Sequence, residues 1–149
     1  MASPPLKGRF KPKNPQKYKG DPRNIIYISS WERDVMHWLD DRSDVKYWMS
    51  EERCYWFHHP IKKRMARYFP DFIVCFQRDY GEEIRVLEIK PKKYCSPPKT
   101  PKRKTKSYYY HLEQYAINMA KWKAMEKECE NRGWNFQILT EDNVKNWNK

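Results

Sequence analysis

"RYFPDFIVCFQRDYGEEIRVLEIKPKK", residues 67–93, is the stretch that decides the fold. Two apolar runs within it, "RYFPDFIVCFQ" and "EIRVLEIKP", flank the turn-forming letters "RDYGEE", which is the pattern of two strands joined by a turn. Side chains alternate between the two faces of a strand, so Ile84, Val86, Glu88 and Lys90 share one face of the second run. The stretch therefore predicts a strand pair that carries a glutamate and a lysine side by side on a mostly apolar face.

Helical patterns lie on both sides of this strand pair. After "ISS", apolar residues recur every three or four positions, and Ser29 stands three residues before Glu32 in the form of a capping box. A second helix is expected over residues 108–131, just ahead of Gly133. Shorter patterns predict strands in "VKYWMSEERCYWFHH" and "WNFQILT" and a short final helix in "EDNVKNW". This order of elements predicts an α/β fold with a mixed β-sheet flanked by helices.

Length and composition indicate one soluble domain made inside a cell. The chain has 149 residues, so a single domain is expected over 1–149, and 39% hydrophobic content with 7 Trp, 11 Tyr and 6 Phe allows a core. No stretch approaches the roughly 18 apolar residues of a membrane span, and nothing resembles a signal peptide, so no membrane partner is expected. The four cysteines form no C-x-x-C pair and are expected to be reduced.

The positive charge is concentrated in two proline-rich segments. Net charge is +12; residues 1–23 carry seven Lys or Arg against one acid, and residues 90–106 carry eight against none. Neither segment has enough apolar residues to order itself in isolation. They are either solvated segments or, as we predict, a basic N-terminal arm (1–23) and an internal basic loop (91–107) that bind the phosphates of double-stranded DNA. The predicted DNA-binding side chains are Lys11, Lys13, Lys17, Lys19, Lys92, Lys93, Lys102, Arg103, Lys104 and Lys106.

Three tyrosines follow the internal basic loop in the run "YYY", residues 108–110. They exceed what a core of this size needs. They either dock a partner or pack the long helix that begins there. Of the two, packing is the prediction.

Two carboxylates can meet where the predicted strands lie side by side. Asp71 heads one strand after a proline, and Glu88 lies in the neighbouring strand. Mg²⁺ and Mn²⁺ prefer oxygen ligands, so Asp71, Glu88, the backbone carbonyl of Ile89 and retained waters form a candidate metal site. Glu32 completes the acidic cluster if its helix packs over the sheet. Lys90 would then orient a water or meet negative charge at a phosphodiester, which predicts a metal-dependent nuclease with the catalytic residues Glu32, Asp71, Glu88 and Lys90.

Each of these residues also has an ordinary structural interpretation. Glu32 is equally explained as the capping-box acid of its helix, and the two roles are compatible. Asp71 could bond turn amides, and Glu88 with Lys90 could form a surface ion pair worth at most about 1 kcal/mol. From the residues alone, these alternatives remain open.

Taken together, these residues resemble a known family. "PDF" followed by "LEIKP" resembles the PD-(D/E)xK nuclease signature, with Glu32 as the acid on an early helix. Nearly the whole chain is similar to the head-completion nucleases of T-even and related tailed phages, and more distantly to TnsA-type transposon endonucleases. The segments that carry the similarity are "KGRFKPKNPQKYKGDPRNIIY", "SSWERDVMHWLD", "SEE", "RYFPDF", "LEIKP", "YAINMAKWKA" and "RGWNFQILTE".

The resemblance implies a restriction-endonuclease-like core and a role for Lys121 as a supporting polar residue of the site. It implies a Mg²⁺- or Mn²⁺-dependent endonuclease with little sequence preference, acting on DNA after packaging and before tail joining. Portal or neck proteins would be partners, in the virion head or in the host cytoplasm during assembly. Ile28, Ala66 and Met119 stand where the family pattern leads us to expect polar residues. The alternative is a non-enzymatic head or neck component that binds portal and DNA.

Overall fold

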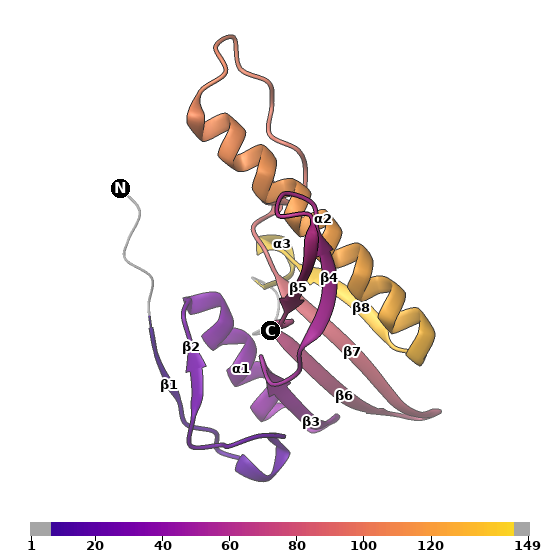
Figure 1. Ribbon diagram of the computed structural model, residues 1–149. Coiled ribbons are helices and arrows are strands. Elements are labelled where there is room, and N and C mark those ends of the chain that lie inside the picture. Colours follow the sequence, from indigo (N-terminus) through magenta and orange to yellow (C-terminus); the bar gives the residue numbers. More distant parts are fainter. Residues whose placement is uncertain (1–6, 145–149) are drawn as a thin grey trace.

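The computed structural model describes residues 7–144 (Figure 1). The first six residues of the predicted arm and the end of the predicted final helix lie outside this range. The helices are α1 (Ser30–Asp41), α2 (Lys106–Arg132) and α3 (Glu141–Val144), with short 3-10 turns η1 (Pro15–Lys17) and η2 (Lys92–Tyr94). The strands are β1 (Gly8–Phe10), β2 (Ile25–Tyr27), β3 (Val45–Ser50), β4 (Tyr55–His59), β5 (Arg64–Tyr68), β6 (Phe72–Arg78), β7 (Gly81–Ile89) and β8 (Asn135–Leu139).

A mixed four-stranded sheet forms the centre, in the order β3-β6-β7-β8. Strand β6 is antiparallel to both of its neighbours, β3 and β7, whereas β8 runs parallel to β7. Two separate hairpin-like pairs, β1-β2 and β4-β5, accompany it. The predicted α/β class with a mixed sheet flanked by helices is confirmed. None of the helices in the described part of the chain is long and apolar enough to cross a membrane.

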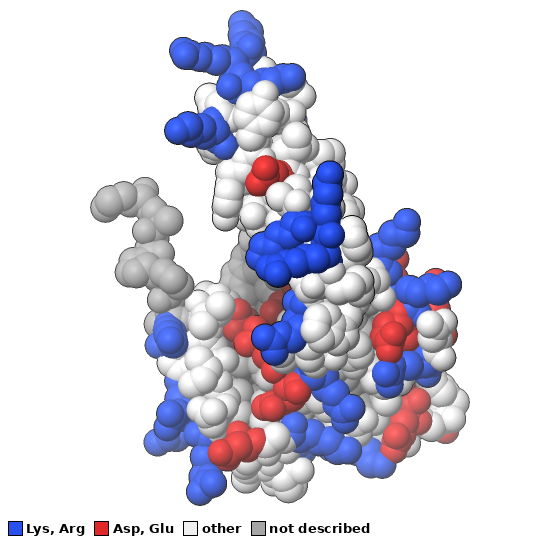
Figure 2. All heavy atoms as spheres, viewed as in Figure 1, with Lys and Arg blue, Asp and Glu red and all other residues white. Residues whose placement is uncertain are grey.

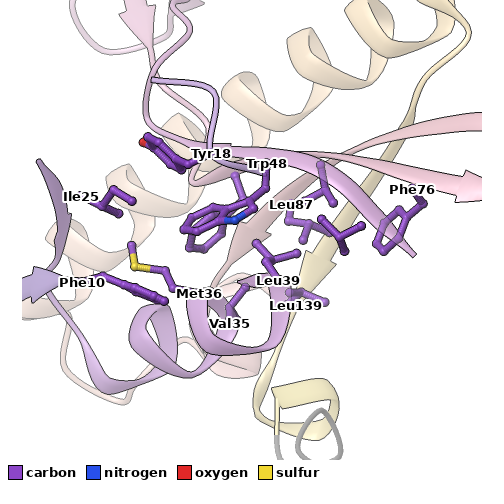
Figure 3. Close-up of a cluster of buried hydrophobic side chains, with 13 residues drawn as sticks. Phe10, Tyr18, Ile25, Val35, Met36, Leu39, Trp48, Phe76, Leu87 and Leu139 are labelled. Carbon is purple, nitrogen blue, oxygen red and sulfur yellow. The ribbon is translucent and has the colours of Figure 1, made fainter. Parts of the chain in front are cut away.

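Alternation along the strands sends side chains into two cores on opposite faces of the sheet. On one face, α1 packs on the sheet around the fully buried Trp48 (Figure 3). On the other, α2 and the β4-β5 hairpin cover Ile73 and Val86. The predicted alternation of β7 holds, because Val86 lies in the α2 core and Leu87 in the α1 core. The sheet is thus covered on both faces, and its strand ends remain as the place for a site.

The predicted start of α1 and end of α2 are confirmed. Ser29 Oγ accepts the backbone N–H of Glu32 at 3.1 Å, and Glu32 Oε2 accepts that of Ile28 at 3.2 Å. Gly133 has a φ of +73°, the left-handed conformation that favours glycine after a helix. The predicted start of α2 at residue 108 is two residues late, since Thr105 caps the helix by accepting the N–H of Tyr108.

One strand prediction is confirmed only in part. A strand does begin just after Pro70 and Asp71, as expected, but "RYFPDFIVCFQ" is not a single strand, because β5 ends at Tyr68 and β6 begins at Phe72. Pro70 explains the break, since proline lacks the backbone donor that a continuing ladder needs. The consequence is that Tyr68 belongs to the β4-β5 hairpin while Asp71 sits at the entrance to the central sheet.

The N-terminal basic segment is ordered by the rest of the domain. Its strand β1 pairs with β2, and Phe10 and Tyr18 are buried in the α1 core. Lys17 Nζ donates to the carbonyls at the end of α1, including that of Asp40 at 2.9 Å and that of Arg42 at 2.6 Å. These bonds give Lys17 a helix-capping position, in place of the free ammonium group that a DNA contact needs.

The loop between β7 and α2 projects from the body together with the first half of α2 (Figure 1). The buried residues of α2 begin only at Trp122. Tyr109 and Tyr110 are 50% and 59% exposed, so the prediction that the "YYY" run packs the helix is wrong for these two. Lys106 lies inside α2 and not in the predicted loop.

Candidate active site

Asp71 and Glu88 lie next to each other where β6 begins and β7 ends. The register pairs Phe72 with Leu87, which brings the two acidic residues to the same end of the sheet. Asp71 Oδ2 accepts the backbone N–H of Ile89 at 2.8 Å, and Glu88 Oε2 accepts the N–H of Asp71 at 3.4 Å. The buried hydroxyl of Tyr68 also donates to Glu88 Oε2. Backbone and side chain together therefore fix both carboxylates.

Each carboxylate keeps one oxygen without a donor. Within residues 7–144, Asp71 Oδ1 and Glu88 Oε1 accept no hydrogen bond, and neither side chain forms an ion pair with Lys, Arg or His. By contrast, Glu83, the other buried glutamate of β7, forms ion pairs with Arg78 at 2.9 Å and with Arg85 at 2.6 Å. The free oxygens are suited to receive a cation from solution.

Burial raises the pKa of both carboxyl groups. For Asp71, the negative charge of Glu88 adds to the effect of burial and raises the pKa well above its usual value. For Glu88, burial raises the pKa while the hydrogen bond from Tyr68 and the charge of Lys90 oppose it. Two acids that share a buried site repel each other when both ionise, and a divalent cation removes that repulsion.

Two further acids surround this pair. Burial raises the pKa of Glu32 and of Glu51, and the charges of both raise the pKa of Asp71. Glu51 donates its backbone N–H to the carbonyl of Asp71 at 3.3 Å and has a φ of +52°, which is uncommon outside glycine. Helix α1 thus brings Glu32 to the cluster, as expected. Glu51 was missed, and its only sequence sign is that "SEE" is one of the family-like segments.

The predicted set of metal donors is only partly assembled. No three Asp, Glu, His or Cys side chains of residues 7–144 are arranged so that they could hold a metal ion together. Asp71 and Glu88 are adjacent, whereas Glu32 is close enough to influence the pKa of Asp71 but does not join them in such a group. Mg²⁺ commonly takes one or two carboxylates and retains several waters, so the Asp71–Glu88 pair fits this ion.

Two lysines lie near the pair. Lys90 follows β7, donates its backbone N–H to Leu139 at 2.9 Å, and its charge lowers the pKa of Glu88. Lys121 comes from α2, with its Nζ 5.6 Å from the centre of the Tyr68 ring, and its charge also lowers the pKa of Glu88. Both predicted lysines therefore lie on the Glu88 side of the site.

The predicted DNA-binding side chains lie mostly at the surface, and within residues 7–144 none of them forms an ion pair with Asp71 or Glu88. Nine of the ten predicted DNA-binding residues are exposed, Lys17 being the exception. Lys92 pairs with Asp142 at 3.3 Å, and Lys93 lies 5.0 Å from the centre of the Tyr94 ring. Figure 2 shows Lys and Arg over the projecting end of the molecule and over the β4-β5 hairpin, with Asp and Glu between the hairpin and α1.

Comparison with known proteins places the chain among endonucleases. The model of the TnsA-like endonuclease N-terminal family matches residues 42–141. That range includes Asp71, Glu88 and Lys90 but not Glu32. The head completion nuclease of Enterobacteria phage T4 is 35% identical over 142 residues, which covers 93% of each chain. The sequence and the fold therefore agree, and the chain belongs to the TnsA-like endonuclease family.

Proposed function

We propose that this chain is a Mg²⁺- or Mn²⁺-dependent DNA endonuclease of the PD-(D/E)xK type that acts in phage head completion. The observation that carries the proposal is the Asp71–Glu88 pair: two buried, hydrogen-bonded carboxylates that lack a cationic partner among residues 7–144. Membership of an endonuclease family supports it, as does the likeness to a phage head completion nuclease.

The residues of the chain have distinct tasks in this mechanism. Asp71 and Glu88 would hold the metal through their free oxygens, with the carbonyl of Ile89 as a third ligand and Glu32 acting through the waters around it. Held there, a divalent ion would supply Lewis-acid chemistry, namely polarisation of a phosphodiester oxygen and a more acidic water. Lys90 and Lys121 would bring positive charge to the side of Glu88, where negative charge develops on the phosphate.

Substrate binding in this proposal depends on the phosphate backbone. The exposed lysines and arginines of the N-terminal segment and the internal loop contact phosphates, which carry no sequence information. Cleavage of double-stranded DNA should therefore show little sequence preference and should weaken with salt. In this proposal the chain acts as a single domain, whose partners are DNA and the portal or neck proteins, in the virion or in the host cytoplasm during assembly.

A plasmid-nicking assay tests the proposal. Wild type, Asp71→Ala and Lys90→Ala are compared in Mg²⁺, in Mn²⁺ and in EDTA, with DNA binding measured separately. We expect metal-dependent nicking that both variants lose while they still bind DNA. DNA binding without nicking in either metal would overturn the proposal in favour of a structural head or neck component.

A further inference from the structure

The β4-β5 hairpin is a third basic segment of the chain. Residues 53–70 contain five Lys or Arg and no Asp or Glu. This concentration is hidden in the sequence, because the part of the chain outside the two proline-rich segments is slightly acidic as a whole. Pairing of β4 with β5 gathers the five charges on one two-stranded ribbon. The cations of the hairpin are Arg53, Lys62, Lys63, Arg64 and Arg67.

The hairpin cations differ in their partners from the cations on the central sheet. Lys46, Arg78 and Arg85 each form an ion pair with a neighbouring acid. Within residues 7–144, none of the five hairpin cations does so, and all five side chains are exposed. Like charges held together repel each other, and an anionic partner relieves that repulsion.

The turn of the hairpin is held in one shape. His59 Nδ1 accepts the backbone N–H groups of Ile61 at 3.2 Å and Lys62 at 3.1 Å, and Lys63 donates its N–H to the carbonyl of His59 at 2.8 Å. Burial and the charges of Lys62, Lys121 and Arg64 lower the pKa of His59, which favours the neutral ring that can accept these bonds. The cations at the turn are thus presented on an ordered backbone.

The outer face of the hairpin also carries apolar side chains. Trp56 is 60% exposed and pairs across the strands with Arg67, and the exposed Met65 pairs with His58. The inner face is anchored, since Phe57 and Tyr68 are buried against α2. One face therefore fixes the ribbon to the domain, and the other offers the apolar surface of Trp56 and Met65 beside Arg67. Arg64 belongs to the anchored face but is exposed, because it lies at the turn end of the ribbon.

We propose that the β4-β5 hairpin enters the major groove of double-stranded DNA beside the cleaved phosphate. The major groove, about 12 Å wide, admits a two-stranded ribbon, whereas the minor groove of about 6 Å does not. Lys62, Arg64 and Arg67 contact phosphates at the groove edges, and Trp56 contacts the groove interior. Figure 2 shows the basic side chains over the hairpin next to the acids between it and α1.

The hairpin is joined directly to the proposed active site. Tyr68 is the last residue of β5 and donates to Glu88, and Asp71 follows three residues later. At about 3.3 Å per residue, the turn lies roughly 13–16 Å from Tyr68, comparable with the width of the groove. This inference rests on the proposed function, because it identifies DNA as the partner through that site. The partner that we propose for the hairpin is DNA and not an acidic protein surface.

The test is a fluorescence-anisotropy titration of a labelled duplex in EDTA, with the full chain. Lys62→Ala/Arg64→Ala/Arg67→Ala should weaken binding at least about tenfold and reduce the salt dependence (log K against log salt) by roughly 2–3. Lys62→Arg/Arg64→Lys/Arg67→Lys keeps the charges and should bind as wild type does. Trp56→Ala should weaken DNA binding. Tyr80→Ala should not, although Tyr80, in the turn between β6 and β7, is 80% exposed.

The groove is tested by competition, with methyl green expected to displace the protein and netropsin not. Unchanged affinity and salt dependence in the triple variant would overturn the inference and leave the hairpin to an acidic protein partner. Displacement by netropsin alone would also overturn it. Because EDTA prevents cleavage, this test is separate from the nuclease: the hairpin can bind DNA in a protein that nicks nothing, and nicking can persist without the hairpin.

Discussion

Strand β7 carries two buried glutamates with opposite electrostatics. Glu83 is 7% exposed and Glu88 is 9% exposed, so burial alone does not distinguish them. Burial would raise the pKa of Glu83, but hydrogen bonds from Arg85, Arg78 and Asn135 lower it below its usual value. At Glu88 burial keeps the pKa raised, and among residues 7–144 the only side-chain donor to this carboxylate is the neutral hydroxyl of Tyr68.

The difference separates an acid that has its cationic partners within the domain from one that we propose to hold a metal ion. Around Glu83 the chain supplies the positive charge that a buried carboxylate needs, so the group is complete without a ligand. Around Glu88 it supplies a second carboxylate, Asp71, and leaves the positive charge to come from outside. The comparison distinguishes the ion-paired acid near one end of the sheet from the candidate site at the other.

The largest effect should be on the nicking rate, when the charge of Glu88 or that of Glu83, near opposite ends of β7, is removed. Glu88→Gln should lower metal-dependent nicking at least about a hundredfold, since it removes a proposed metal ligand and leaves the shape intact. Glu83→Gln should leave the nicking rate within about twofold of wild type under conditions where both variants are folded. Initial rates on supercoiled plasmid measure both. Equal losses in the two variants would remove the distinction between the two glutamates.

The free energy of unfolding should be lowered more by Glu83→Gln than by Glu88→Gln, the reverse of the order expected for activity. Glu83→Gln weakens charge-assisted bonds to Arg78 and Arg85 and should destabilise the protein by about 2 kcal/mol. Glu88→Gln removes an unfavourably buried charge and should leave stability unchanged or higher in EDTA. Urea denaturation measures both free energies of unfolding. Destabilisation by Glu88→Gln alone would contradict the assignment.

A smaller effect, on metal affinity, should follow from removing the Tyr68 hydroxyl that holds Glu88 in place. Tyr68→Phe keeps the packing against Phe57 but removes the hydroxyl that holds Oε2. Outer-shell partners of metal ligands are typically worth about 10- to 100-fold, so Mn²⁺ affinity should fall about tenfold. Loss of this bond also raises the pKa of Glu88, so the pH above which Mn²⁺ binds should move upward. An unchanged affinity and pH profile would make Tyr68 a packing residue only.

The smallest effect should be on the melting temperature, Tm. Asp71 and Glu88 have raised pKa values in the folded state, so their contribution to stability is present at low pH and lost as the pH rises through those values. In EDTA the Tm should therefore gain from this pair at mildly acidic pH. At pH 7.5, Mg²⁺ should raise the Tm of wild type by a few degrees but not that of Asp71→Asn. Differential scanning fluorimetry measures both, and a Mg²⁺ shift retained in Asp71→Asn would contradict the metal assignment.

Local patterns predicted much of this architecture. The capping box at Ser29, the alternation along β7 and the glycine after α2 depend on neighbouring residues, and the structure confirms them. That Asp71 and Glu88 lie side by side was expected from the strand pair, while their metal-binding role stays a prediction. The ordering of the N-terminal segment depends on contacts with α1 that no local pattern reveals.

What the sequence did not reveal depends on long-range contacts. Glu51 reaches the acid cluster through a positive-φ turn after β3, and no spacing rule marks it. The break at Pro70 turns an expected strand into two elements, which hides both the β4-β5 hairpin and the bond from Tyr68 to Glu88. The hairpin cations emerge as a group only once β4 and β5 are paired.

Calorimetric titration with Mn²⁺ tests the central claim most directly. Wild type, Glu88→Gln and Glu83→Gln are compared at pH 7.5, each after a check that it is folded. We expect wild type and Glu83→Gln to bind Mn²⁺ with similar affinity, and the affinity of Glu88→Gln to be at least tenfold lower. Binding of Mn²⁺ by Glu88→Gln at wild-type affinity would contradict the proposal, because Glu88 would then not be a ligand of the metal ion.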